Sequence, residues 1–394
     1  MKANNINALY LATGPFMAIY ALPNGLQLNW LLVGLLVILN WNYISKMSFF
    51  KKRFNEIRWF FAIMIIGLMG ALGNIGSSFF DTTLYLHNLF SIIIFFITLI
   101  VFTNNCNVDT FKKFLFVCGI IVSVVCLYQR AQLLLTGSFK VDVFIPGLIV
   151  NRDLETFSTS RVSSFFTEPA HLAIYLLPIY YISLYDKKIP ISLLCAAGIL
   201  FSGSSTGFLL LFALSFVYML KNNKSKKYLF MVPFMGIIAF IFVNTYFPDV
   251  LLSNINKIES TNSNDLRHLG PLSYIKYMDV WQMIFGIGLN QLTNFLKCNG
   301  IFLISQWGEE INANYANAVI YSFLSYGLLG FVSCLLYFNR TIRYNKSNLG
   351  FVVFALGILL SDQVLFNRNL LYLIIFLIYS EKLLNNNEST IYNK

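Results

Sequence analysis

One short stretch of the chain combines a cation, a carboxylate and an imidazole with the start of an apolar segment. It runs from Arg161 through Glu168, Pro169 and His171 to Ala173. Ionisable groups near lipid are costly unless they pair, face water or take part in chemistry. These three residue types together suit a reaction that moves a proton and holds an anion. The structural alternative is a solvated loop end that happens to precede a helix.

Glu168 and His171 are the two candidates for a general base. A carboxylate or an imidazole in a half-dry site can take the proton of a hydroxyl group. The two residues are three positions apart and share one face if both are helical. We expect Glu168 to be the base, because it lies at the outer lip of the helix. Pro169 suits a first helical turn, so Glu168 can instead serve as a cap, and His171 can be a buried, hydrogen-bonded histidine.

Two arginines, Arg161 and Arg267, each belong to one of the two long polar segments of the chain. A guanidinium group binds phosphate oxygens through two parallel hydrogen bonds and stays charged, so this pair suits a pyrophosphate. A headgroup anchor or a salt bridge to a nearby acidic residue is the alternative for each. Arg130 lies near the end of an apolar segment, where it lines the same cavity or extends to headgroups.

A metal centre is not expected from the pattern of possible ligands. Asp153 and Glu155 form the only suggestive acidic pair, and the three histidines at 87, 171 and 268 are scattered. The six cysteines show no CxxC spacing and lie mostly within apolar runs. We interpret them as packing residues, and we expect neither a disulfide framework nor a cofactor.

The elements that position these residues follow from the composition. The chain has 57% hydrophobic and 11% charged residues over 394 positions, whereas an ordinary soluble domain has about 25% charged residues. Its mean hydropathy is +0.67. The sequence therefore predicts an all-α, polytopic membrane protein that forms one integral membrane domain. The net charge of +11 does not indicate nucleic-acid binding, because the basic residues fall in short clusters between apolar runs.

Twelve apolar segments have about the length that a membrane-spanning helix requires. They are residues 6–22, 28–45, 59–79, 84–103, 114–136, 164–185, 189–203, 206–220, 229–247, 316–338, 349–364 and 370–381. The segment from 189 to 220 is too long for one span, and Ser202 to Gly207 supplies the expected break.

The distribution of lysine and arginine predicts the orientation. With the N-terminus placed inside, the inner segments hold 19 of the 28 basic residues. The positive-inside rule then places both termini in the cytoplasm. Two long segments, 137–163 and 248–315, fall outside, and the second includes a stretch from Pro271 to Phe295 with the spacing of an amphipathic helix. Such a helix lies either on the bilayer or against the core of a small extramembrane domain.

Several motifs, in order, resemble the O-antigen polymerase and ligase superfamily. They are Arg161, Phe166 to Ala173, Ser202 to Gly207, Arg267, Ile284 to Gly288, and Asn317 ahead of Tyr326 to Gly330. The motifs cover nearly the whole chain, and each is weak by itself. The resemblance adds Asn317 to Arg161, Arg267 and Arg130 as candidate substrate-binding residues.

The resemblance implies a glycosyltransferase of the bacterial inner membrane with the helical fold of lipid-dependent transferases. Its substrate would be an undecaprenyl-pyrophosphate-linked oligosaccharide, polymerised at the periplasmic face into O-antigen, capsule or exopolysaccharide. The lipid bilayer, a flippase and a chain-length regulator would be its partners, with no nucleic acid. The polymerase branch is favoured over the ligase branch, because ligases carry a histidine where this chain has Ala316. A ligase and a lipid-linked glycan flippase or transporter remain the alternatives.

Overall fold

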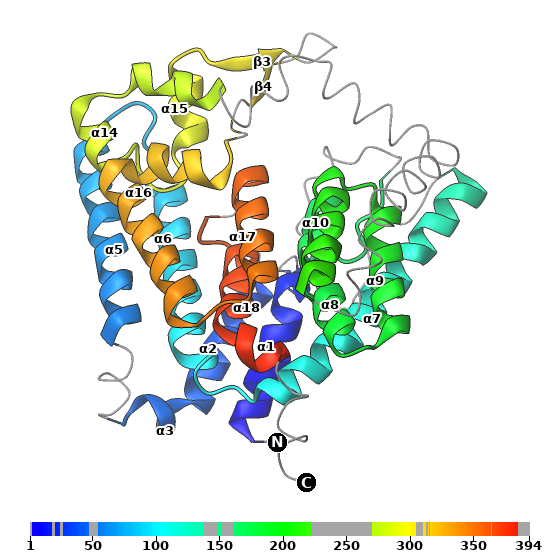
Figure 1. Cartoon of the computed structure of the whole chain (residues 1–394). Helices are drawn as coiled ribbons and strands as arrows, with labels where there is room; N and C mark the ends of the chain where they lie inside the picture. Colours follow the sequence, from blue (N-terminus) through cyan, green and yellow to red (C-terminus); the bar gives the residue numbers. More distant parts are fainter. Residues whose placement is uncertain are drawn as a thin grey trace.

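The computed structural model consists mainly of α-helices (Figure 1). It describes residues 2–17, 20–23, 27–46, 54–137, 148–150, 161–221, 270–304, 310–312, 314, 316–363 and 365–384. Two pairs of very short antiparallel strands accompany the helices: β1 (Tyr20–Ala21) with β2 (Ile149–Val150), and β3 (Phe302–Ile304) with β4 (Glu310–Asn312). The expected all-α class is therefore correct.

The helices follow one another along the chain with few residues between them. In the first half they are α1 (Ala3–Met17), α2 (Leu28–Leu39), α3 (Trp41–Ile44), α5 (Phe54–Asn74), α6 (Thr82–Ile97) with its π-helical continuation η1 (Thr98–Phe102), α7 (Val108–Thr136) and α8 (Pro169–Tyr185). In the second half they are α9 (Ile189–Ser202), α10 (Ser205–Lys221), η4 (Gly270–Tyr277), α14 (Val280–Phe285), α15 (Leu292–Cys298), α16 (Ala318–Tyr344), α17 (Leu349–Ser361) and α18 (Arg368–Leu384).

Four helical segments within the described residues are long and apolar enough to cross a membrane. They are Ile57–Asn74, Thr82–Phe102, Val108–Thr136 and Ala318–Tyr344, and α2, α9, α10 and α17 are shorter apolar helices. Eleven of the twelve predicted segments contain a helix, and the twelfth segment, 229–247, lies outside the described residues. A bundle of twelve crossing helices is therefore not confirmed, because several of the helices are shorter than a bilayer's hydrocarbon core.

Polar residues at the helix ends explain where several helices begin and end. Asp81 caps α6 by accepting from the backbone N–H of Thr83 and Leu84. The expected break between α9 and α10 is present, because α9 ends at Ser202 and Gly203 takes a left-handed conformation with φ of 71°. The Ser204 hydroxyl then accepts from the Gly207 N–H at the start of α10.

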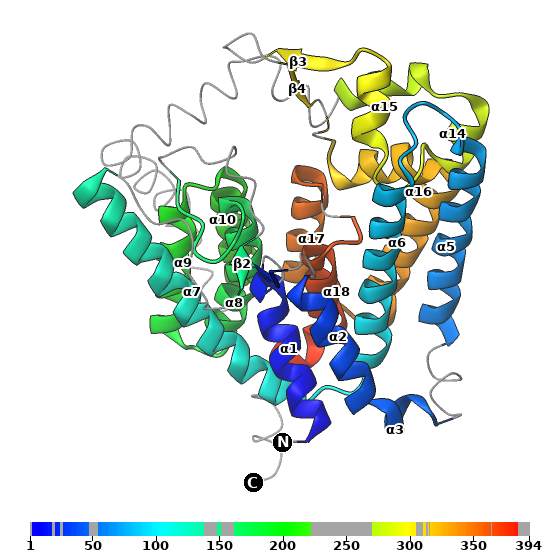
Figure 2. The same ribbon diagram turned by 180° about the vertical axis from the view of Figure 1, so that it is seen from behind.

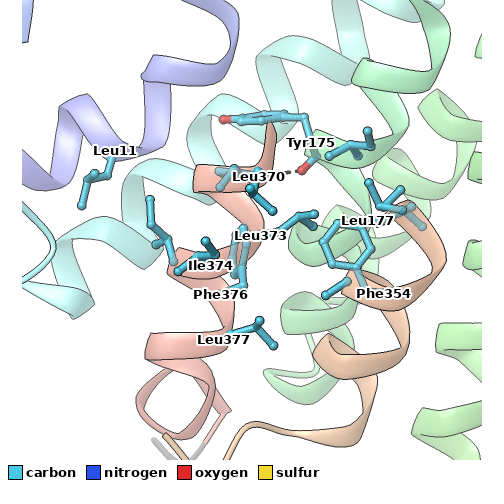
Figure 3. Close-up of a cluster of buried hydrophobic side chains, with 14 of the residues drawn as sticks. Leu11, Tyr175, Leu177, Phe354, Leu370, Leu373, Ile374, Phe376 and Leu377 are labelled. Atoms are coloured by element: carbon cyan, nitrogen blue, oxygen red, sulfur yellow. Dashed lines mark hydrogen bonds between the residues drawn. The ribbon is translucent and has the colours of Figure 1, made fainter. Parts of the chain in front are cut away.

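The core of the bundle surrounds α8 and α18 (Figure 3). Tyr175 of α8 and Tyr372 of α18 stack with ring centroids 5.1 Å apart, and the Tyr372 hydroxyl donates to the Tyr175 carbonyl oxygen at 3.2 Å. Leu177, Leu373 and other aliphatic side chains fill the space around this pair. The two helices are buried on most sides, so they hold the start of α8 and the start of α18 in fixed positions.

The segment from Pro271 to Phe295 forms three short elements in place of one amphipathic helix. Gly286 and Gly288 have φ of 88° and 103°, and these left-handed residues end α14 and separate it from α15. Tyr274, Phe295 and neighbouring side chains belong to a second buried cluster with Tyr321 of α16. Helices η4 and α15 therefore pack on a buried cluster that they share with α16, and their position relative to the bilayer stays a prediction.

A close backbone crossing holds this second cluster against the bundle. The N–H of Ile287 donates to the Leu324 carbonyl at 3.0 Å, and that of Gly288 donates to the Ser325 carbonyl at 3.3 Å. The two acceptor carbonyls belong to the part of α16 in which the helix is interrupted. The interruption is at Gly327, whose φ of 67° and ψ of −171° are not helical. A Cβ atom on Gly286 would collide with the Ser325 carbonyl. The motifs at 284–288 and 326–330 therefore pack directly against each other.

Helix α1 begins and α18 ends at one end of the bundle, and α14, α15 and the β3–β4 pair lie at the other (Figures 1 and 2). The cytoplasmic location of the termini, which the charge distribution predicts, stays a prediction. The end at which α1 begins and α18 ends is called the terminal end, and the opposite end is called the distal end.

Candidate functional site

A polar cavity of about 400 Å³ opens among α1, α2, α6, α8 and the α17–α18 connection. Most of its lining is polar, which is unusual for a chain of this hydropathy. The polar residues are Gln27, Asn29, His87, Asn88, Ser91, His171, Asn290, Asn314, Gln363, Asn367, Arg368 and Asn369, with Tyr10, Trp30 and Tyr321 among the aromatic ones. A polar site within an apolar bundle is a functional site by default.

His171 projects into this cavity from the first turn of α8. Its Nδ1 lies 2.9 Å from the Thr167 hydroxyl, and its Nε2 lies 3.6 Å from the Oδ2 atom of Asp362. The side chains of His171 and Asp362 are 18% and 22% exposed. Because both are partly shielded from water, the carboxylate interacts with a protonated imidazole more strongly than at an open surface. This arrangement is that of an imidazole base oriented by a carboxylate on one side and a hydroxyl on the other.

Asp362 is held at this place by the ends of two helices. It follows the last residue of α17, and its backbone carbonyl accepts from the Ala318 N–H at the start of α16 at 2.9 Å. The next residue, Gln363, donates its side-chain amide to Asn314 at 3.2 Å. The carboxylate that faces His171 is thus fixed by contacts between parts of the chain far apart in sequence.

Arg368 adds a permanent positive charge to the same cavity. It is the first residue of α18, where the Asn367 side chain caps the helix by accepting from the N–H groups of Asn369 and Leu370. His87 of α6 lines another wall, with its ring 5.1 Å from that of Trp30. A guanidinium at a helix N-terminus is a favourable setting for a phosphate or pyrophosphate group.

The Arg161 side chain points to the turn between α9 and α10. Its Nη2 donates to the Gly203 carbonyl at 2.8 Å, so it connects two of the motifs on which the family resemblance rests. The same segment is fixed to α7, where Gln129 exchanges two hydrogen bonds with the backbone of Ser164, at 2.7 and 3.2 Å. Arg161 does not line the cavity.

The other residues selected from the sequence have separate positions. Glu168 precedes α8, is exposed, and makes no capping hydrogen bond through its side chain within the described chain. Arg130 is buried within α7. Asn317 caps α16 by accepting from the Ile320 N–H at 3.0 Å. Arg267 lies outside the described residues, so its predicted role has no structural context. Of the five candidates that lie within the described residues, only His171 lines the cavity.

Asp362, Arg368 and His87 are the residues that the sequence reasoning missed. Asp362 falls at the end of the predicted span 349–364, and Arg368 lies six positions later, just before the predicted span 370–381. An acidic and a basic residue in so short a connection between apolar segments are a detectable signal, because such residues are costly near lipid. Their proximity to His171 could not be detected, since it depends on how α17 and α18 pack against α8.

Among the described residues, no cluster of three histidine, cysteine, aspartate or glutamate side chains is placed to hold a metal ion. No protein-family model matches the chain, and no curated protein matches it either. The geometry of the cavity and the quoted motifs are therefore the two grounds for assigning a function.

Proposed function

We propose that this chain is a glycosyltransferase of the bacterial inner membrane that polymerises undecaprenyl-pyrophosphate-linked oligosaccharide repeat units at the periplasmic face. The observation that carries the proposal is the polar cavity that His171 and Arg368 line, together with the Asp362 carboxylate 3.6 Å from the His171 imidazole. The order of motifs that resemble the polymerase and ligase superfamily supports the same conclusion. A flippase and a chain-length regulator would act with it in the membrane.

The volume and position of the cavity suit a sugar donor attached to a lipid. A volume of about 400 Å³ is in the range of ligand sites and accommodates a few sugar-sized groups. His171 lies in the first turn of α8 and Arg368 begins α18, and Figure 1 shows that α18 ends at the terminal end of the bundle. The reacting groups thus lie toward the distal end, which would be the periplasmic side if the termini are cytoplasmic.

The reaction requires a base for the acceptor and a cation for the leaving group. The acceptor hydroxyl oxygen forms a bond to the anomeric carbon of the donor, and the bond from that carbon to the pyrophosphate oxygen breaks. The hydroxyl proton passes to His171, and the pyrophosphate leaves with the bonding electron pair. Arg368 offsets the negative charge that gathers on the leaving group, by two parallel hydrogen bonds or by its charge alone.

The positions of the two imidazole nitrogens indicate which of them accepts the proton. The carboxylate of Asp362 favours a proton on Nε2, so the lone pair is on Nδ1, next to the Thr167 hydroxyl. An acceptor hydroxyl that replaces Thr167 at this position would present its proton to Nδ1. After transfer, the imidazolium faces the Asp362 carboxylate, which stabilises it. The cavity therefore favours His171 over Glu168 as the base.

A strain that lacks this protein, complemented with variants, tests the proposal through its surface glycan. Glycan separated on a gel should show long polymer with the wild-type protein and mainly single repeat units with His171→Gln or Asp362→Asn. Asp109→Asn, which removes a carboxylate from the first turn of α7, is the matched control and should keep the polymer. A strain that accumulates full-length polymer unattached to its lipid would instead identify a ligase, and absence of all product would indicate an earlier step such as translocation.

A further inference from the structure

At the terminal end of the bundle, an open hollow of about 640 Å³ lies between α5 and α16. Its wall includes Arg58 and Trp59 of α5 and Leu336, Arg340, Arg343 and Tyr344 of α16. It is separate from the polar cavity and shares no lining residue with it. We propose that this hollow binds the headgroup of an anionic phospholipid.

The charge of the hollow is the first reason. Three guanidinium groups line it, and no acidic side chain among the described residues does. Among the described residues, none of the three arginines takes part in an ion pair. Arg340 and Arg343 are three positions apart on α16, so their side chains share one face. A ligand with several negatively charged oxygens would neutralise this cluster.

The position of the hollow along the axis of the bundle is the second reason to propose a lipid headgroup. One candidate span begins at Ile57 and another ends at Tyr344, so Arg58 lies in the first turn of one span and Arg340 and Arg343 lie near the end of the other. Arg58 lies over the Trp59 ring, 5.5 Å from its centroid, and Tyr344 is 78% exposed. Tryptophan and tyrosine gather at the level of lipid headgroups, and arginine on the cytoplasmic side binds anionic lipid there.

The apolar surface beside the hollow distinguishes a lipid from a free phosphate. Leu336 lines the hollow and is 51% exposed, and Phe61, one turn further into the membrane along α5, is 56% exposed. Exposed apolar side chains continue along both helices, with Ile65 on α5 and Val332 on α16. A glycerophospholipid would place its phosphate against the arginines and its acyl chains along these side chains. A free phosphate would leave the apolar part uncovered.

Binding of phosphatidylglycerol to the purified full-length protein in detergent tests the inference. Native mass spectrometry, with an increasing concentration of lipid, gives an apparent dissociation constant for the tightest site. The double variant Arg340→Gln/Arg343→Gln should bind phosphatidylglycerol about 30-fold more weakly, since each basic residue near a membrane surface contributes about fivefold. Arg58→Gln, on the other helix, should weaken binding about fivefold. Lys113→Gln/Lys382→Gln removes two exposed charges at the same end of the bundle and should bind as the wild type does.

The remaining measurements separate the headgroup from other ligands. Phosphatidylcholine should bind the wild-type protein much more weakly than phosphatidylglycerol, and glycerol phosphate should not compete at equal concentration. Equal binding of the two lipids would overturn the inference in favour of an unspecific apolar groove. Equal competition by glycerol phosphate would overturn it in favour of a free-anion site. Unchanged affinity in both arginine variants, with an elution volume like that of the wild type, would also overturn it.

Discussion

At the scale of single residues, the cavity and the sequence favour different candidates for the proposed base. Glu168 lies at the helix lip, as expected, but its exposed side chain does not line the cavity. His171 is one turn further along, and it meets Asp362 and Thr167 there. A base must reach the substrate hydroxyl, so position in the cavity outweighs closeness to the end of the helix.

Turnover of purified enzyme with a lipid-linked repeat unit separates these two candidates. His171→Gln should lower the rate between about a hundredfold and ten-thousandfold, which is the usual contribution of a general base. Glu168→Gln should keep most of the rate, because the exposed carboxylate is outside the cavity. Near-normal turnover by His171→Gln beside an inactive Glu168→Gln would reverse the assignment.

Arg161 can be tested by the conservative change to lysine. Its hydrogen bond to the Gly203 carbonyl, at 2.8 Å, connects the segment before α8 to the α9–α10 turn. Arg161→Lys should lower thermal stability in detergent by about 1 kcal/mol and reduce polymer formation, because an ammonium group does not reproduce the planar fork. Measurement of the melting temperature and of KM for the lipid-linked donor distinguishes the two effects. A raised KM at unchanged stability would indicate that Arg161 contacts the pyrophosphate directly.

At the scale of helices, glycines decide how the distal elements attach to the bundle. The 284–288 segment and the interruption of α16 approach so closely that side chains have no room between them. Three of the contacting glycines have left-handed backbones, at 286, 288 and 327. The sequence indicated the segments 284–288 and 326–330 as motifs, but it did not indicate that the two segments contact each other.

Substitution of Gly286 tests the importance of this crossing. Gly286→Ala should destabilise the protein by at least about 2 kcal/mol, because the new Cβ meets the Ser325 carbonyl and the left-handed φ is strained. Gly300→Ala is the matched control, since Gly300 also has a left-handed φ of 67° but has open space around its Cβ position. It should cost about 1 kcal/mol. Equal melting temperatures of the two variants would show that the crossing contributes little to stability.

At the scale of the whole molecule, α1 begins and α18 ends at the same end of the bundle (Figure 1), and a lysine lies against the end of α18 there. Lys112 illustrates the structural use of such a charge, because its ammonium group bonds to Asp186 and to the Leu383 carbonyl, at 2.7 and 2.8 Å. One lysine thereby joins α7, α8 and α18 at the terminal end. Basic residues at the ends of membrane-spanning segments can in general set the orientation and contact lipid headgroups.

Reporter fusions test the orientation on which the proposed active face depends. Fusions at Lys51, Lys224 and Arg343 should report the cytoplasm, and fusions at Asn151 and Thr261 should report the periplasm. The expectation follows from the excess of lysine and arginine in the segments that include the first three sites. A cytoplasmic signal at Thr261 would place the polar cavity toward the wrong face for a periplasmic transferase.

The sequence by itself determined the helical class, most helix positions and the break at Ser202 to Gly207. These features depend on local properties, namely runs of apolar residues and glycine or capping residues at the ends, which neighbours in space do not alter. Only the tertiary structure decided that Asp362, 191 positions after His171, would face its imidazole, and that Arg161 would bond to Gly203. Contacts of this kind depend on how α8, α17 and α18 pack. The periodicity of one segment shows which face of its helix is apolar, but not which other helix packs against that face. The polar cavity is likewise a product of packing, because its lining comes from helices distributed over the chain.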